Sequence, residues 1–460
     1  MSFAALAAAA SIAAAYSPDA GCAQALCGTQ ALAPFFDALT RARSGGRTVH
    51  ILQIGDSHSA GDAITGPWRE ALQTRFGSGG RGVMPPGHPF DGFLPHGVHV
   101  DQSPGWTVES TFRADPNLPP AFGVSGFRLT STVDGAQLML TAEPQEAFRR
   151  LVVCAETRQG GGAYTVTLGA TSRQVALDAP GRRVECDTFA SDAPQVQATL
   201  VTSGGPVTLT SWASFSDAGG VAVSNLGVVG AELKHFERTD DQAVGEELRA
   251  YHPDLIVLEF GTNDGFVGHF SAATFEERLR EQIRRLKRLS GGAPILVMAA
   301  PDAETRRADL LHNDDEGGPP PANDSDLGAP PPSPDDDATL ARMADEATLA
   351  HLADQAVADD APQRCCTTVR APEPRLPWYS PPALAQLRGI QKRVALSLGE
   401  AYWDWGGRMG GPGAADRWAT ADPPLDRGDR VHNTTAGGIR VAGLLESDLD
   451  RAYAAYKASH

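Results

Sequence analysis

The distribution of apolar positions along the chain predicts an α/β protein. Short continuous apolar runs, which are typical of buried strands, lie at 49–54, 255–260, 294–300 and 401–405. Segments with helical character lie around them, at 31–39, 68–76, 240–251, 273–289, 383–398 and 436–456. Strands that alternate with helices form parallel sheets. We therefore expect one α/β domain built on a parallel sheet.

A different pattern occupies the chain from 107 to 216. Short β-rich runs alternate there with turn residues, at a spacing of roughly 8–14 residues and without helical periodicity. These runs lie at 126–130, 137–140, 150–154, 164–168, 196–200 and 207–212. The pattern predicts a β-sandwich-like module. Because the α/β pattern resumes after it, the module at 107–216 is an insertion that divides the α/β domain into residues 21–106 and 217–460.

Composition and charge restrict the classes of partner. The chain has 42% hydrophobic residues and a formal net charge of -17. Such a negative charge disfavours electrostatic binding to nucleic acid or anionic lipid. It does not disfavour binding to neutral or weakly charged carbohydrate. We predict no nucleic-acid partner and no membrane span in the mature protein. The acidic, Pro-rich segment 302–337 cannot bury enough apolar surface to fold, and we expect a disordered loop there rather than an acidic metal site.

The N-terminal segment and the cysteines favour export. Residues 1–20 contain an uncharged Ala-rich run that is too short to span a bilayer and resembles the apolar part of a secretory signal. The usual Lys or Arg before it is missing, so an Ala-rich helix and a misplaced start codon are alternatives. The even count of six cysteines suits an oxidising compartment, periplasmic or extracellular. Other pairings are open from sequence, but the candidate pairs are Cys22–Cys27, Cys154–Cys186 and Cys365–Cys366.

Ser57 is a candidate nucleophile. It lies in a Gly-Asp-Ser turn between the apolar run at 49–54 and a helix, where its hydroxyl is lifted out of the sheet. Its backbone N–H lies at a helix N-terminus, where negative charge is stabilised. A serine nucleophile needs a base and an acid that orients the base. Asp429 and His432 have a suitable spacing, although a Gly-Asp-Ser turn and an Asp-x-x-His pair are each more often structural.

Candidate donors for a tetrahedral intermediate are also present. Asn263 ends a strand in a Gly-Thr-Asn-Asp turn and offers a side-chain amide, and Gly230 offers an unobstructed N–H, with Gly227 as an alternative. Each alone is more often a turn residue. The Gly-rich loop 76–87 lacks the Gly-Lys-Ser/Thr of a phosphate cradle and is too broken for any element, so a cleft wall is its expected role. No Cys/His cluster has zinc spacing, and we predict no metal and no cofactor.

Together these blocks resemble the SGNH (GDSL-type) hydrolase family. They occur in the family's order: Gly55-Asp56-Ser57, Asn225-Leu226-Gly227-Val228-Val229-Gly230, Gly261-Thr262-Asn263-Asp264 and Asp429-x-x-His432. The resemblance covers about 46–106 and 217–460 and implies a flavodoxin-like three-layer α/β/α fold. It also implies Ser57 as nucleophile and first oxyanion donor, with Gly230 and Asn263 as the other donors. His432 would be the base and Asp429 its orienter.

Some details resemble the bacterial envelope branch of this family, which includes peptidoglycan O-acetylesterases. They are the run from Gly55 to Asp62, the loop 76–82, the inserted module, and Trp403-Asp404-Trp405 with Met409-Gly410-Gly411. In that branch the inserted module resembles a carbohydrate-binding domain. His58 stands where many relatives carry Leu. We expect it to pack or to line the rim of the site, without a catalytic role.

The expected function is that of a serine esterase, a carboxylic ester hydrolase. It would remove O-acetyl groups from an envelope or secreted polysaccharide through an acyl-enzyme. A polysaccharide O-acetyltransferase with the same triad and a non-catalytic polysaccharide-binding or assembly protein are the alternatives. A histidine base must be neutral, so activity is expected to fall below about pH 6–7.

Overall fold

The computed structural model describes residues 22–459, apart from 24, 45–46, 91–92, 94, 119–120, 308–309 and 311–376. The predicted leader at 1–20, most of the predicted loop at 302–337, and Cys365 and Cys366 lie outside the described residues. The prediction of disorder is wrong at the start of that loop, because residues 302–305 are ordered and buried. None of the described helices is long and apolar enough to cross a membrane.

The central sheet consists mainly of parallel strands. Five of them lie side by side in the order β15 (Val221–Gly227), β3 (Val49–Gly55), β16 (Leu255–Glu259), β17 (Ile295–Met298) and β18 (Ala401–Trp403). By position in the chain this is the order 2-1-3-4-5 of doubly wound, flavodoxin-like sheets. Antiparallel β2 (Leu26–Cys27) and β1 (Cys22–Ala23) extend the β18 edge. A disulfide joins Cys22 to Cys27, which confirms that predicted pair.

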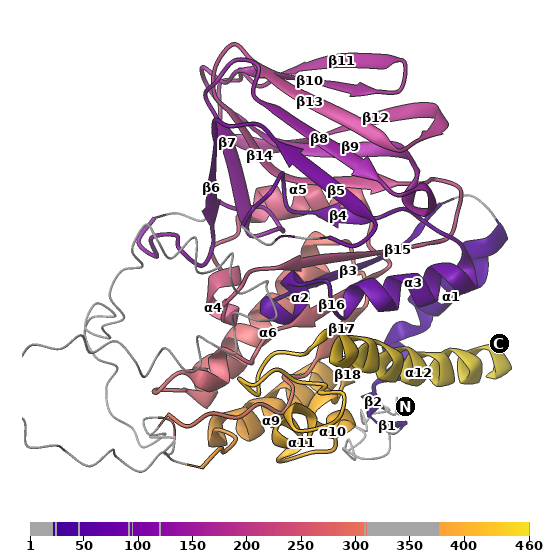
Figure 1. The fold of residues 1–460 in the computed structure, drawn as a ribbon, viewed down its shortest axis with the longest axis vertical. Helices are drawn as coiled ribbons and strands as arrows, with labels where there is room; N and C mark the ends of the chain where they lie inside the picture. The colour runs from indigo at the N-terminus through magenta and orange to yellow at the C-terminus, as the bar shows by residue number, and fades with distance from the viewer. Residues whose placement is uncertain are drawn as a thin grey trace, which may run out of the picture.

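Side chains of the central strands alternate between two hydrophobic cores. In β3, Leu52 and Ile54 contribute to one core, and Val49 and Ile51 to the other. The first core is covered by α5 (Asp241–Tyr251), α6 (Ala272–Leu289) and α9 (Pro382–Ser397). The second is covered by α1 (Ala33–Arg41), α3 (Thr65–Phe76) and α12 (Thr435–Ser459) (Figure 1). Burial on both faces explains why these strands are continuous apolar runs.

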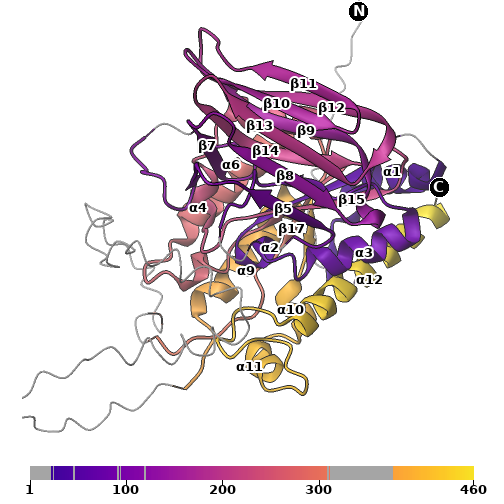
Figure 2. The same ribbon diagram turned by 45° about the horizontal axis from the view of Figure 1, so that its top comes forward.

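Residues 82–215 contribute two antiparallel sheets that share a third core (Figure 1 and Figure 2). The first has the order β11 (Thr171–Ala176), β10 (Ala163–Leu168), β13 (Gln197–Ser203), β8 (Gln137–Ala142) and β5 (Val98–Gln102). The second has the order β12 (Arg183–Gln195), β9 (Phe148–Thr157), β14 (Val207–Phe215), β7 (Phe127–Ser131) and β6 (Trp106–Ser110), with β4 (Gly82–Met84) beside β14. A disulfide joins Cys154 on β9 to Cys186 on β12, which confirms a second predicted pair.

All six runs predicted as strands between 126 and 212 are strands. The two sheets also include β4 and β5, which precede residue 107. The prediction that the Gly-rich loop 76–87 holds no element is therefore wrong at β4. Its three buried residues form a strand because β14 offers them an antiparallel partner, and local sequence does not contain that partner.

The second antiparallel sheet is anchored to helix α5. Val152 of β9 and Phe215 of β14 belong to the same core as α5, on the face opposite the third core. Glu247 of α5 is fully buried and accepts a hydrogen bond from Thr210 Oγ1 at 2.7 Å. Burial raises the pKa of this carboxyl. The contact therefore combines apolar packing with buried hydrogen bonds, which hold the antiparallel sheets against the central one.

Candidate active site

The candidate nucleophile lies at the carboxyl end of β3, between the edge strand β15 and β16. Gly55 ends the strand, and Ser57 begins the short helix α2 (Ser57–Ala60). The Asp56 side chain caps this helix by accepting a hydrogen bond from the His58 N–H at 3.0 Å. A Cβ on Gly55 would lie 2.3 Å from the Glu259 carbonyl oxygen of β16, so only glycine allows this close approach. The turn thus presents Ser57 at the edge where ligands bind in open α/β sheets.

His432 and Asp429 meet Ser57 in a chain of hydrogen bonds. Ser57 Oγ lies 2.9 Å from His432 Nε2, and His432 Nδ1 lies 2.8 Å from Asp429 Oδ2. The second Asp429 oxygen accepts hydrogen bonds from the Val431 and His432 N–H groups, at 2.9 and 3.0 Å. The carboxylate therefore shapes its own loop while it holds the ring. The structure brings together the three residues that the sequence singled out.

Asp429 is ionised through the ordinary pH range. Burial alone would raise its pKa, but the hydrogen bond and the charge of His432, with the two backbone N–H groups, outweigh burial and lower the pKa to about 2. A carboxylate at this place stabilises a protonated His432 and fixes which ring nitrogen carries the proton of the neutral form. The pair has the electrostatics of a base and its orienting acid.

Gly230 and Asn263 lie in the loops that follow β15 and β16. Asn263 Nδ2 donates to the Ala231 carbonyl at 3.0 Å and to Asp56 Oδ2 at 3.3 Å. Gly230 has a φ of 77°, which favours glycine, and a Cβ there would lie 3.2 Å from the Phe112 ring. Among the described residues, no acceptor receives a hydrogen bond from the N–H of Ser57 or of Gly230. These two amides are therefore available to a ligand.

Gly227, the alternative to Gly230, has a packing role. A Cβ at Gly227 would lie 2.1 Å from the Ala60 amide nitrogen and 2.4 Å from the Asp56 carbonyl oxygen. Glycine is needed there because β15 passes directly beneath α2. This position supports the turn that carries Ser57, and it favours Gly230 over Gly227 as a donor.

His58 makes more hydrogen bonds than the sequence suggested. It lines the cleft and packs edge-on against Trp405, as expected, but it is only 5% exposed. Its Nδ1 lies 3.0 Å from Asp56 Oδ1, and its Nε2 lies 2.9 Å from the Val431 carbonyl oxygen. Burial would lower its pKa, but the charge of Asp56 and the hydrogen bonds outweigh burial and raise the pKa to about 10. The Val431 partner is 373 residues away in the chain, so no local signal could reveal it.

Asp56, His58 and Glu259 form a buried cluster whose potential ligand atoms lie within 4.8 Å of one another. Both ring nitrogens of His58 face acceptors, a carboxylate and a carbonyl, so both carry protons and neither offers a lone pair to a metal. Burial and the neighbouring Asp56 raise the pKa of Glu259 well above its usual value, which favours its neutral form. The hydrogen bonds of His58 are those of a buried ion pair, and this donor set does not suit a metal.

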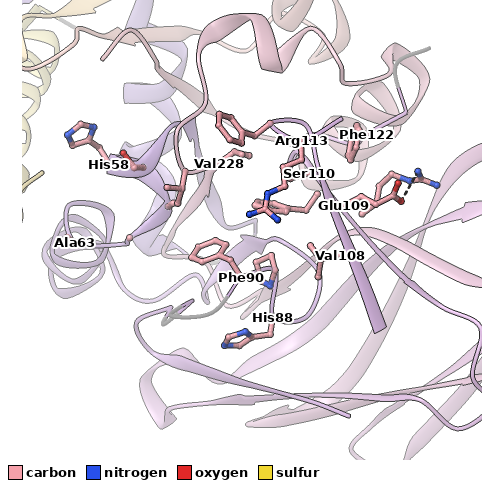
Figure 3. A pocket seen from close by; sticks show the side chains of 18 of the residues that line it. His58, Ala63, His88, Phe90, Val108, Glu109, Ser110, Arg113, Phe122 and Val228 are labelled. Atoms are coloured by element: carbon pink, nitrogen blue, oxygen red, sulfur yellow. Dashed lines mark hydrogen bonds and ion pairs between the residues drawn. The ribbon is translucent and has the colours of Figure 1, made fainter. Parts of the chain in front are cut away.

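A cleft of about 1860 Å³ extends from Ser57, His58 and His432 to the antiparallel sheets. Figure 3 shows His58 and Ala63 at one end and Val108, Glu109 and Ser110 of β6 at the other. Apolar side chains gather on its walls. Four of the seven large apolar side chains that are exposed in the described residues line this cleft: Val108, Phe112, Leu118 and Ile439. Their concentration in one place marks a binding surface rather than scattered surface residues.

Comparisons with known proteins identify a similar fold. The chain is similar to a solved peptidoglycan O-acetylesterase, with a TM-score of 0.65 and 22% identity over 92% of this chain and 96% of that one. A family two carbohydrate esterase from Cellvibrio japonicus (TM-score 0.17, 14% identity, 44% and 79% covered) superposes poorly. So does a salicylyl acyltransferase of a tetracycline biosynthetic pathway (TM-score 0.27, 12% identity, 80% and 96% covered). No curated protein matches the sequence.

The family model of the GDSL-like lipases and acylhydrolases matches residues 195–438, more than half of the chain. The match contains Gly230, Asn263, Asp429 and His432, whereas Ser57 precedes it. The long antiparallel segment between Ser57 and β15 explains why one continuous match starts so late. This chain belongs to the GDSL-like lipase/acylhydrolase family, and its fold is that of the SGNH hydrolases.

Proposed function

We propose that this protein is a serine esterase that removes O-acetyl groups from an envelope or secreted polysaccharide. The observation that carries the proposal is the chain of hydrogen bonds from Ser57 Oγ through His432 to Asp429, with distances of 2.9 and 2.8 Å. A hydroxyl, a base and an orienting carboxylate in this geometry suit nucleophilic acyl transfer.

In the proposed reaction, His432 Nε2 accepts the Ser57 proton while Ser57 Oγ attacks the acetyl carbonyl carbon. The tetrahedral intermediate collapses when His432 returns that proton to the sugar oxygen, which leaves as a hydroxyl. Water then attacks the acetyl-serine with His432 again as base, and acetate is released. Asp429 keeps the ring oriented and stabilises its protonated form in both halves of the reaction.

The oxyanion would be held by the N–H groups of Ser57 and Gly230 and by Asn263 Nδ2. The two amides donate to no described acceptor, which supports this role. Asn263 Nδ2 already has two acceptors, Ala231 O at 3.0 Å and Asp56 Oδ2 at 3.3 Å. The longer bond, to Asp56, is the one that an oxyanion would replace. Donors fixed before the reaction stabilise developing negative charge without reorganisation.

We assign the two antiparallel sheets to a β-sandwich-like module inserted into a flavodoxin-like, three-layer hydrolase domain. Its β6 edge lines the same cleft as Ser57 and His432. We therefore propose that this module binds the carbohydrate chain while Ser57 attacks the acetyl group. Two cross-linked cysteine pairs favour an oxidising compartment, so we propose a periplasmic or secreted protein.

A serine-directed phosphonate tests the nucleophile. We expect mass spectrometry of the treated protein to locate a single adduct on the peptide that contains Ser57, because among the described residues that line the cleft only this hydroxyl is hydrogen-bonded to a histidine. Ser224, whose Oγ lies 2.7 Å from His50 Nε2, is fully buried and out of reach of the phosphonate. Acetate release from an O-acetylated glycan, compared with acetyl transfer to an unacetylated one, then identifies the acceptor as water. No adduct, or one on another serine, contradicts the proposal.

Phe112 tests the cleft as a glycan site. Its ring is 42% exposed, lines the cleft and lies beside Gly230. We expect Phe112→Ala to raise KM for an O-acetylated polymer roughly tenfold, equivalent to about 1.4 kcal/mol of contact, with little change for 4-nitrophenyl acetate. Val133→Ala is the control, because Val133 is 49% exposed outside the cleft. Equal effects of both variants on the polymer would refute a glycan contact at Phe112.

A further inference from the structure

His58 links the two segments that carry the candidate catalytic residues. It follows Ser57 directly, and its Nδ1 donates to Asp56, which caps the same turn. Its Nε2 donates to the carbonyl of Val431, the neighbour of His432. One ring therefore joins the end of β3 to the loop before α12. No disulfide in the described residues joins these two segments.

The His58 ring also lies directly against the His432 ring. The two ring centroids are 5.5 Å apart with an interplanar angle of 29°, a stacked arrangement. On its other side His58 meets the edge of Trp405, with centroids 5.0 Å apart. The fully buried Trp405 fixes the position of the ring, so His58 cannot turn away from His432.

The hydrogen bonds determine the charge of His58. Its two ring nitrogens face a carboxylate oxygen and a carbonyl oxygen, and neither partner can donate. Both nitrogens must then carry protons, which makes the ring a cation. Its side chain is almost fully buried, so solvent does not screen this charge from His432.

We propose that His58 is a positioning residue, a permanently protonated histidine that aligns the His432 loop with the Ser57 turn and opposes protonation of His432. The inference rests on the proposed function, because it assigns His58 a role toward His432 as the base. A cation at this distance disfavours a second cation on the neighbouring ring. Removal of the charge on His58 should therefore favour protonation of His432.

The other charged groups around the two rings support this reading. The Asp56 carboxylate lies 3.0 Å from His58 Nδ1, whereas Oε1 of Glu259 lies 3.9 Å away, and burial and Asp56 raise the pKa of Glu259. On the loop, Asp429 faces His432, and burial raises the pKa of Asp426 to about 7. Arg430 is turned to Asp416 at 2.8 Å. The cation stacked on the His432 ring is therefore His58.

Three substitutions separate charge from packing. His58→Gln removes the charge but keeps a polar side chain, His58→Leu removes both, and His58→Lys keeps a charge without the ring. We expect the acid limb of the kcat/KM profile for 4-nitrophenyl acetate to move to higher pH by roughly one unit in the Gln and Leu variants. In the Lys variant the limb stays near its wild-type position while kcat falls. Superimposable profiles for wild type and His58→Gln would overturn the proposal.

A measurement on the unaltered protein guards against variants that do not fold. In a spectrum of ¹⁵N-labelled histidine rings, we expect the His58 ring to remain doubly protonated from pH 5 to about pH 9, because its pKa is raised to about 10. Titration of this ring near pH 6.5 would overturn the proposal. The phosphonate adduct on Ser57 is read separately, so its loss would count against the proposed function, whereas a titrating His58 counts only against this inference.

The raised pKa of His58 also predicts in which direction the free energy of unfolding changes with pH. A group whose pKa is higher in the folded state stabilises the fold fully below its unfolded pKa of about 6.5, and that contribution is lost as the pH rises through about 10. We expect the free energy of unfolding of the wild type to fall across this window. The fall should be smaller in His58→Gln, and equal slopes for the two proteins would contradict a charged His58.

Discussion

Ser57→Ala is expected to lower kcat/KM for 4-nitrophenyl acetate by about 10⁴-fold or more, because it removes the oxygen that forms the acyl-enzyme in the proposed reaction. The nearest alternative hydroxyl, Ser59, is buried and donates to Glu259 at 2.9 Å, so it cannot take over. The substitution removes one oxygen from a half-buried side chain, and the fold should be unaffected. Initial rates over a range of substrate concentrations measure the effect.

Ser110→Ala is the matched control for Ser57→Ala. Ser110 lies in the same cleft, on β6, but no histidine is hydrogen-bonded to it in the described residues. Ser110→Ala should change kcat/KM by less than about threefold, which is the effect expected of a surface substitution. If Ser57→Ala retained wild-type turnover, the whole assignment of the triad would fall.

Asp429→Asn should be the second most damaging change, with a loss in kcat of about 10⁴-fold. An amide is isosteric with the carboxylate and can still accept the hydrogen bonds from the Val431 and His432 N–H groups. Toward His432 Nδ1 it can present an NH₂ group, which favours the wrong tautomer of the ring and does not stabilise its protonated form. Steady-state kinetics with a small ester would reveal the loss, and circular dichroism would show that the fold is kept.

The pH dependence of the wild-type activity gives a further check on the role of Asp429. The wild-type Asp429 has its pKa lowered to about 2, so protonation of this carboxyl cannot cause a loss of activity near neutral pH. The acid limb should therefore reflect the histidine base. Asp101→Asn, on the exposed end of β5, is the control and should behave as the wild type. A large loss in Asp101→Asn as well would point to a general effect of removing charge.

Several features follow from local sequence because each depends on residues close together in the chain. The runs at β3, β16 and β17 are apolar on both faces, which indicates buried parallel strands with helices between them. The turn that carries Ser57 needs Gly55, and the Asp429-x-x-His432 spacing lets a carboxylate bond both the ring and the backbone of its own loop. These constraints are local, so a single sequence contains them.

Other features depend on partners that are distant in the chain. β4 becomes a strand only because β14 pairs with it, and the polar residues of β12 are held in the sheet by nine residues of pairing with β9. Propensity has little weight where a neighbouring strand supplies the hydrogen bonds. The sequence accordingly predicted the apolar strands of the antiparallel sheets, and it missed β4, β5, β6, β11 and β12.

The sequence by itself indicated the alternating apolar strands and helices of the central sheet and the candidate nucleophile with its base and acid, and it offered two of the cysteine pairs as candidates. Only the tertiary structure decided that Gly227 packs beneath α2 while Gly230 faces Phe112, and that the cleft extends from Ser57 to β6. It also decided the state of His58, because a charge depends on the acceptors around it. Those acceptors, Asp56 and Val431, come from opposite ends of the chain and meet only when the sheet has formed.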